Sequence, residues 1–178
     1  MALTKLNFSG SGLSSLPNGS VIQTVSANKL DNTGSADFDA NFENISGLSV
    51  NITPSSTSSK IYVVATLQVS IGGYHITFRI ARGGNAIITP VAAGSRQLGM
   101  AHIYGSTSYN DHYNIESKVM QVLDTTHNST SQLTYTVQGQ NTYNANTTGL
   151  DINGTHSGHD ASYNARTTST ITAMEIKG

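Results

Sequence analysis

The chain has 178 residues, a formal net charge of −1 and 11% charged residues, and it contains no cysteine. Its length suits a single well-buried domain, and it has no basic stripe that would neutralise a run of phosphates, so we expect no nucleic-acid partner. The lack of cysteine excludes disulfides and thiolate metal sites, no apolar stretch is long enough to span a membrane, and the first residues do not resemble a signal peptide.

The first 18 residues differ in character from the rest of the chain. They are small and polar, and Gly10, Gly12 and Pro17 interrupt any regular element. We expect residues 1–18 to form an N-terminal arm that is ordered only by contact with a partner. Residues 19–178 are predicted to form one domain.

Three short strands are predicted before residue 60. The segment Val21–Ala27 alternates apolar and polar side chains, which is typical of a strand. Residues 32–35 are predicted to be a loop. The segment Phe42–Ile52 predicts two short strands hinged at Gly47, and a Thr-Pro pair followed by a serine-rich linker closes it.

The stretch Lys60–Arg82 carries the strongest pattern in the chain. Apolar residues occupy every second position on both sides of Gly72 and Gly73. Two glycines supply the positive φ angles of a tight primed turn, so the stretch predicts one β-hairpin. The side chains expected to fill the core are those of Ile61, Val63, Leu67, Ile76, Phe78 and Ile80.

The remaining elements are also predicted to be strands. After a turn and a short apolar run at Ala86–Ile88, they are expected near Leu98–Tyr104, Tyr113–Leu123, Leu133–Val137, Leu150–Ile152 and Thr170–Ile176. No window longer than two turns shows a helical apolar stripe, so we expect little or no helix. Eight to ten short strands separated by turns predict an all-β fold, an antiparallel β-sandwich of the jelly-roll type.

Several predicted strands carry apolar side chains on both faces. Tyr62 and Val64 lie opposite the series that begins at Ile61, and Met174 and Ile176 lie opposite Ile171 and Ala173. One explanation is that single apolar residues are common on protein surfaces. The other is that the second face is buried in a cyclic oligomer, which we expect to be a homotrimer.

The order of five blocks resembles a jelly-roll module found in structural proteins of tailed bacteriophages, in tail-fibre tips and head fibres of marine and cyanobacterial phages. The blocks are GSVIQTVSA at 19–27, ISGLSVNITPSSTSSKIYVVATL at 45–67, FRIARGGNAII at 78–88, VLDTTHNSTSQLTYTVQ at 122–138 and STITAMEIKG at 169–178. The resemblance implies a trimeric jelly roll, similar to the tumour-necrosis-factor fold, on the exterior of the virion. It brings no catalytic residue and no cofactor.

The resemblance also bears on how the protein is attached. Tail fibres usually carry a long attachment region before such a module, whereas only residues 1–18 precede it here. This suits a head fibre, a decoration protein or a small knob better than a complete tail fibre. The partner would be a capsid protein, or a tail or stalk protein bound through the arm.

Enzymatic chemistry is weakly supported. Glycoside hydrolysis needs paired carboxylates, but most acidic residues lie in polar turns, and Glu116 is the only one expected in mid-strand. The Gly-x-Ser-x-Gly elbow of serine hydrolases does not occur. We therefore expect no enzyme activity, with glycan hydrolysis as the minor alternative.

One cluster has metal-ligand side chains. His156, His159 and Asp160 would be able to hold a divalent ion, although a solvated loop is the favoured interpretation because no rigid second shell is evident. The other histidines, His75, His102, His112 and His127, are predicted to lie on the surface or on a strand face.

Tyrosines carry the best binding hypothesis. Tyr104, Tyr109 and Tyr113 surround Asn110, Asp111 and His112, and aromatic rings beside such polar groups suit sugar recognition. The competing interpretation is that the tyrosines cover the end of the sandwich. We thus expect a non-enzymatic virion protein, and alternatively a module that recognises a host-surface polysaccharide.

Overall fold

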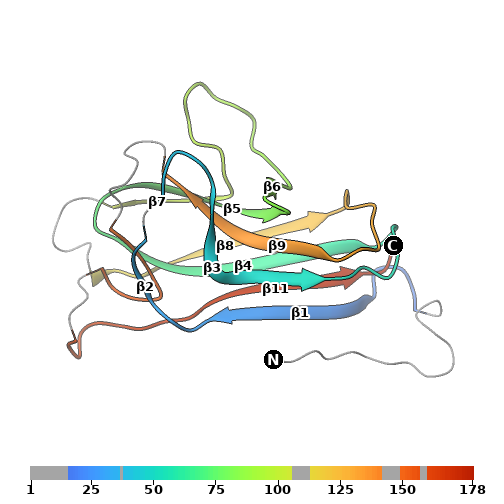
Figure 1. Cartoon of the computed structure of the whole chain (residues 1–178), viewed down its shortest axis with the longest axis horizontal. Helices are drawn as coiled ribbons and strands as arrows, with labels where there is room; N and C mark the ends of the chain where they lie inside the picture. Colours follow the sequence, from blue (N-terminus) through green and yellow to red (C-terminus); the bar gives the residue numbers. More distant parts are fainter. Residues whose placement is uncertain (1–15, 37, 106–112, 142–148, 157–159) are drawn as a thin grey trace.

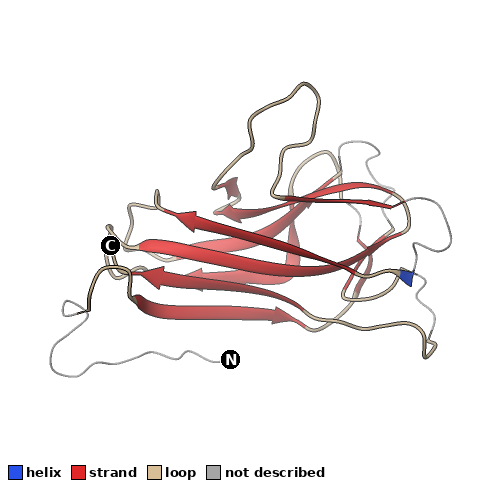
Figure 2. Cartoon of the chain, turned by 180° about the vertical axis from the view of Figure 1, so that it is seen from behind, coloured by secondary structure: helices blue, strands red, loops and turns tan. Residues whose placement is uncertain are grey.

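The computed structural model describes residues 16–36, 38–105, 113–141, 149–156 and 160–178. In these ranges the chain forms strands and no α-helix. The strands make two antiparallel sheets that pack face to face along the long axis of the molecule (Figures 1 and 2). The predicted all-β fold and antiparallel β-sandwich are confirmed. Within the described residues no helix has the length and apolarity needed to cross a membrane.

The first sheet, here called the β4 sheet, is built around the longest strand, β4 (Lys60–Ile71). One edge of β4 pairs with β11 and then with β10, and the other edge pairs with β8. The outer strands are β1, which pairs with β11, and β2, which pairs with β10. The bounds are β1 Val21–Lys29, β2 Thr33–Ala36, β8 Glu116–Asp124, β10 Leu150–Ile152 and β11 Ser169–Ile176.

The second sheet, the β5 sheet, is built around β5 (Tyr74–Arg82). One edge of β5 pairs with β9, which in turn pairs with β3. The other edge pairs with β7 at its start and with β6 at its end. The bounds are β3 Glu43–Ile52, β6 Asn85–Ala86, β7 Ala101–Gly105 and β9 Leu133–Gln140.

The core lies between the two sheets and follows the alternation of the strands. Every side chain of the predicted core set, Ile61, Val63, Leu67, Ile76, Phe78 and Ile80, is fully buried there. The partner strands add inward side chains at every second position, such as Met120 and Val122 of β8. Burial of this apolar surface is the main favourable term in the folding of the sandwich.

The predicted hairpin between β4 and β5 is wrong. The two strands are consecutive and strongly patterned, but they do not pair; each lies in a different sheet. Gly72 lacks the positive φ of a primed turn, and Gly73 has φ 154°. Gly72 donates its backbone N–H to the Gly149 carbonyl at 3.0 Å, so the connection crosses between sheets beside β10. Each of the two strands therefore has neighbouring strands on both of its edges, whereas an outer strand of a hairpin at the edge of a sheet would have a neighbour on one edge only.

Two other local predictions are corrected. Residues 33–35 of the predicted loop 32–35 belong to β2 (Thr33–Ala36), because Thr33 and Ala36 pair with β10 from the far end of the chain. The segment predicted as two strands is the single strand β3, and its register with β9 shifts between Asn44 and Ser49. Gly47 has φ 83° within this shift, so the glycine makes a bulge and does not break the strand.

The two described ends of the chain lie together. Gly19 N–H donates to the Lys177 carbonyl and Lys177 N–H donates to the Ser20 carbonyl, both at 2.8 Å. This pair of bonds extends the β1–β11 ladder. Residues 1–15 lie outside the described ranges, so the N-terminal arm stays a prediction.

Candidate functional site

The candidate site lies on the outer face of the β5 sheet, where β5 and β7 run side by side. His75 and Thr77 alternate with the buried Ile76 and Phe78, so they point away from the core. In the ladder His75 is opposite Tyr104 and Thr77 is opposite His102. The register therefore gathers two histidines, a hydroxyl and a phenol ring on one patch.

Hydrogen bonds fix the order of these side chains. The Thr77 hydroxyl donates to the Gln97 side-chain oxygen, so its own oxygen accepts from Nδ1–H of His102 at 3.0 Å. Nε2 of His102 then faces Nδ1 of His75 at 3.4 Å. Burial lowers the pKa of His102, and the neighbouring His75 and Lys118 lower it further. His102 is accordingly neutral near pH 7.

A cavity of about 630 Å³ opens beside this cluster. Its volume falls in the range of about 300–1,000 Å³ that is typical of small-ligand sites. Its walls are His75, Thr77, Ser95, Arg96, Gln97, Gly99, Met100, Ala101 and His102. A second hollow of about 400 Å³ lies on the other side of residues 95–99, against Phe42, Arg79 and Gln140. We call the two together the 95–99 hollows.

The segment between the hollows lies directly on β5. Met100 N–H donates to the Phe78 carbonyl at 2.7 Å. A Cβ on Gly99 would be 2.7 Å from that same carbonyl oxygen and would also overlap the Thr77 methyl group. Only glycine allows so close an approach to the strand, so Gly99 sets the depth of both hollows.

Arg79 dominates the second hollow. Its guanidinium lies 3.8 Å from the centre of the Phe42 ring, donates to the Gln138 side-chain oxygen at 2.7 Å, and donates to the Gly84 carbonyl at 3.1 Å. Burial lowers the pKa of Arg79, but an arginine keeps its charge at any ordinary pH. The hollow therefore carries a held positive charge.

The structure describes two of the six residues predicted to bind a glycan. The Tyr104 side chain is 60% exposed, and its ring centre lies 4.7 Å from that of His75. Tyr113 instead packs edge-on against Tyr163, with ring centres 5.8 Å apart. Tyr109, Asn110, Asp111 and His112 lie outside the described residues. Tyr104 thus has an aromatic partner that the sequence did not suggest.

The predicted metal cluster is only partly described, because His159 lies outside the described ranges. Nδ1 of His156 lies 2.6 Å from the Asp151 carboxylate, which is buried beneath it in β10. The His156 ring packs on Gly72 and Gly149, where a side chain would collide with it. No group of three or more metal-ligand side chains occurs within the described residues. The three-residue site stays a prediction.

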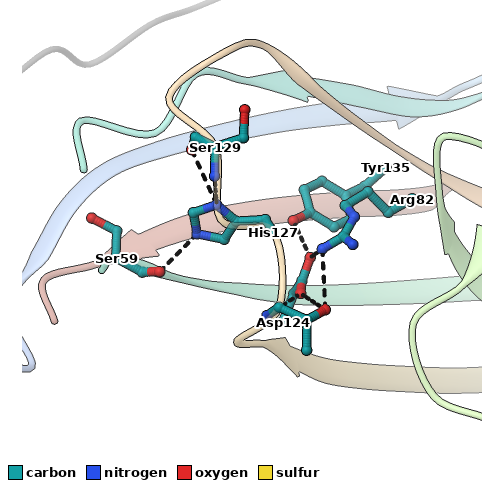
Figure 3. A network of polar contacts seen from close by, with 7 residues as sticks. Ser59, Arg82, Asp124, His127, Ser129 and Tyr135 are labelled. Atoms are coloured by element: carbon teal, nitrogen blue, oxygen red, sulfur yellow. Dashed lines mark hydrogen bonds and ion pairs between the residues drawn. The ribbon is translucent and has the colours of Figure 1, made fainter. Parts of the chain in front are cut away.

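Three carboxylates, including that of Asp151 in β10, are buried in strands rather than placed in turns, which corrects the sequence interpretation. Asp124, the last residue of β8, accepts hydrogen bonds from the Tyr135 hydroxyl at 2.7 Å and from Thr126 N–H at 2.9 Å, and it pairs with Arg82 (Figure 3). Burial raises the pKa of Asp124, but these hydrogen bonds outweigh it and hold the pKa below its usual value. Burial also raises the pKa of Tyr135 far above its ordinary value. The third such acid is Glu175 in β11.

His127 belongs to the same end of the sandwich, and it is buried in the β8–β9 connection instead of lying on the surface or on a strand face as predicted. Its Nε2 lies 2.7 Å from the Ser59 carbonyl, and Ser129 N–H donates to its Nδ1 at 3.2 Å (Figure 3). The ring therefore ties the β8–β9 connection to the start of β4. The network joins strands β5, β8 and β9 to the connections that flank β4 and β9, so we assign it to the scaffold.

The outer face of the β4 sheet has a different character. Tyr62 of β4 lies between Met174 of β11 and Leu123 of β8, and two outward rows further along Thr66 lies opposite Val119. Val119 is 61% exposed and Leu123 is 44% exposed. The outward side chains from Tyr62 to Gln68 and those opposite them are apolar or neutral polar. We call this area the β4 outer face.

Sequence reasoning missed the centre of the site. It placed His75 and His102 on a surface or strand face but did not bring them together, and it did not select Arg96 or Gln97. The alternation in β5 does predict that His75, Thr77 and Arg79 share a face. Nothing local predicts that β7 is the neighbour of β5, or that residues 95–99 fold over it.

Comparison with known proteins does not add to these observations. No protein-family model matches the sequence, and no curated protein matches it at a significant level.

Proposed function

We propose that this protein is a non-catalytic structural component of a virion surface, a trimeric jelly-roll knob, head fibre or decoration protein of a tailed phage. The proposal joins the resemblance of the five sequence blocks to one observation, the β4 outer face. Its capsid, tail or stalk partner would bind through residues 1–18.

The β4 outer face supports association with copies of the same chain. Tyr62, Val119 and Leu123 supply aromatic and apolar surface, and Lys60 is the charged residue at the end of the face. Depletion of charge together with enrichment of aromatic residues marks the centre of a protein interface. Four strands of seven residues cover a flat footprint of about 450 Å². Before the relief of the side chains is added, this is a little more than half of the about 800 Å² per partner of a standard interface.

Mass measurement in solution tests the assembly. We expect sedimentation equilibrium of the full chain at micromolar concentration to give a trimer, and Leu123→Lys to give monomers that keep the wild-type circular dichroism spectrum. The matched control is Ser49→Lys, an exposed position on edge strand β3, which should stay trimeric. A wild-type monomer would overturn the trimer. Absence of the protein from the surface of a virion map would overturn the structural role.

A second function is favoured by the Tyr104–His75 ring pair beside the 95–99 hollows. We propose that this patch recognises a carbohydrate, because an exposed aromatic ring stacks on sugar while neighbouring polar groups bind its hydroxyls. A glycan array tests this directly. We expect hits that are lost in Tyr104→Ala and kept in Tyr163→Ala, an equally exposed tyrosine elsewhere. No hit above background with correctly folded protein would overturn it.

A further inference from the structure

The lining of the 95–99 hollows has an uneven charge. The chain has ten acidic residues and nine Lys and Arg, yet among the described residues that line the hollows there is no carboxylate. Arg79 and Arg96 both contribute, together with His75 and His102, and Arg96 lines both hollows. The hollows are therefore a region of positive potential in a chain that is close to neutral overall.

The two arginines are also bonded differently from three other cations of the protein. Lys29, Arg82 and Lys118 each pair with a carboxylate, from Asp31, Asp124 and Glu116 respectively. By contrast Arg79 donates to Gln138 and Gly84, and Arg96 donates to the Ala93 carbonyl at 3.2 Å. Within the described part of the chain both arginines thus bind only neutral oxygens. A guanidinium has five N–H donors in a fork that matches a carboxylate or sulfate.

The positive charge at neutral pH comes from these arginines and not from His102. The lowered pKa of His102 leaves its ring neutral, bonded through Thr77 to Gln97. Lys118, the other cation that acts on His102, pairs through its ammonium group with Glu116. Polar groups able to bind hydroxyls, such as the Ser95 side chain, line the same cavity.

We infer that the 95–99 hollows bind an acidic saccharide, one that carries a carboxylate or a sulfate. Arg96 would bind the anionic group from the segment between the hollows, and the exposed Tyr104 ring at the His75 rim would stack on an adjoining sugar. Arg79, held over Phe42, supplies a second positive charge. The inference rests on the carbohydrate-recognition function proposed above and adds the chemical class of the ligand.

Paired glycans separate the two claims. An array that holds uronic-acid and sulfated oligosaccharides beside their methyl-esterified or unsulfated counterparts should give binding to acidic members at least about tenfold tighter than to neutral ones. Arg96→Gln should weaken acidic binding about tenfold or more and leave neutral binding unchanged. The control Arg166→Gln removes an exposed arginine outside the hollows and should bind as wild type does. Raising the salt concentration should weaken the acidic complex selectively.

The alternative results each have a clear meaning. Equal binding to acidic and neutral partners would overturn the acidic-ligand inference and leave carbohydrate recognition standing. An equal loss in Arg96→Gln and Arg166→Gln would show adhesion through net charge and would also overturn the inference. No binding to any glycan would overturn both claims. Arg96 is exposed and bonds only within its own turn, so the variant should fold, and its thermal melt should match that of wild type.

Discussion

Glu175 offers the sharpest test of how this sandwich is held together. Its side chain is 0% exposed, in β11 between β1 and β4. The carboxylate accepts hydrogen bonds from Gln23 Nε2 at 2.6 Å, from Ser55 N–H at 2.7 Å and from the Ser55 hydroxyl at 2.7 Å. The donors are neutral, and Ser55 lies in the connection between β3 and β4. Glu175 therefore fastens that connection to the β4 sheet.

Replacing Glu175 by Gln keeps the size of the side chain but changes its hydrogen bonding. The amide oxygen would still accept hydrogen bonds, but the NH₂ group is itself a donor and would stand where the carboxylate accepts a hydrogen bond from Gln23 or Ser55. A hydrogen bond to a charged group contributes about 1.5–3 kcal/mol, and an unmade buried bond costs about 1–3 kcal/mol. We expect Glu175→Gln to lower the free energy of unfolding by about 3 kcal/mol. At about 2–4 °C per kcal/mol in a chain of this size, Tm should fall by about 6–12 °C.

The pH dependence provides a second signature. Burial raises the pKa of Glu175, but the polar donors of Ser59, Ser55 and Gln23 outweigh it and leave the pKa below its ordinary value. A carboxylate whose pKa is lower in the folded state stabilises the protein above its unfolded pKa. That stability is lost as the pH falls through the folded pKa. Wild type should therefore destabilise below about pH 4.5, the ordinary value for glutamate, and Glu175→Gln should do so less steeply.

Urea denaturation at pH 7 and pH 3.5 would measure both effects. The control is Glu116→Gln, whose half-exposed carboxylate pairs with Lys118 and should cost no more than about 1 kcal/mol. Asp124 also has a lowered pKa, so acid sensitivity should be reduced in the Glu175 variant and not abolished. If Glu175→Gln unfolds at the same urea concentration as Glu116→Gln, the proposed role of the carboxylate is refuted.

Two further predictions concern buried contacts between elements. Tyr135→Phe removes the hydroxyl that donates to Asp124, and it should lower the free energy of unfolding in urea by about 1–3 kcal/mol. The control Tyr62→Phe removes a hydroxyl on the β4 outer face and should lower it by less than about 1 kcal/mol. Equal losses in the two variants would contradict the role of the buried network. Gly72→Ala should lower the free energy of unfolding by about 1–3 kcal/mol, because the added methyl group would overlap the His156 ring. In a His156→Ala background this loss should largely disappear. An unchanged loss in that background would show that the strain lies in the backbone and not in the contact with His156.

The sequence predicts the strands and the core well because both depend on local alternation. Every second residue of β4 and β5 is buried, as the pattern indicates, and all-β packing follows from it. Pairing is a different matter. Alternation tells which face of a strand is buried but not which strand lies next to it, so Gly72 and Gly73 between two strong patterns indicated a hairpin. In the structure the backbone of Gly72 bonds to Gly149 instead.

The buried acids show the same limit. In β11 the alternation that buries Ile171 and Ala173 also places Glu175 inward. A carboxylate is stable there only if donors meet it, and the donors come from Gln23 and Ser55, far away in the sequence. The site at the 95–99 hollows likewise depends on β5, β7 and a loop that meet only in three dimensions. A single sequence contains no local pattern that predicts such contacts between distant segments.

The two outer faces of the sandwich complement each other in the proposed assembly. The β4 outer face is nearly uncharged, whereas the 95–99 hollows lie on the opposite side of the molecule and carry Arg79 and Arg96. Copies that associate through the β4 outer face would thus leave their hollows exposed to solvent. A trimer would then present three equal sites, and simultaneous binding along a polysaccharide raises the overall affinity well above that of a single site. Leu123→Lys should consequently weaken binding to a polymeric acidic glycan and leave binding to a short oligosaccharide unchanged. Equal effects on the two ligands would contradict the assignment of assembly to the β4 outer face and of binding to the 95–99 hollows.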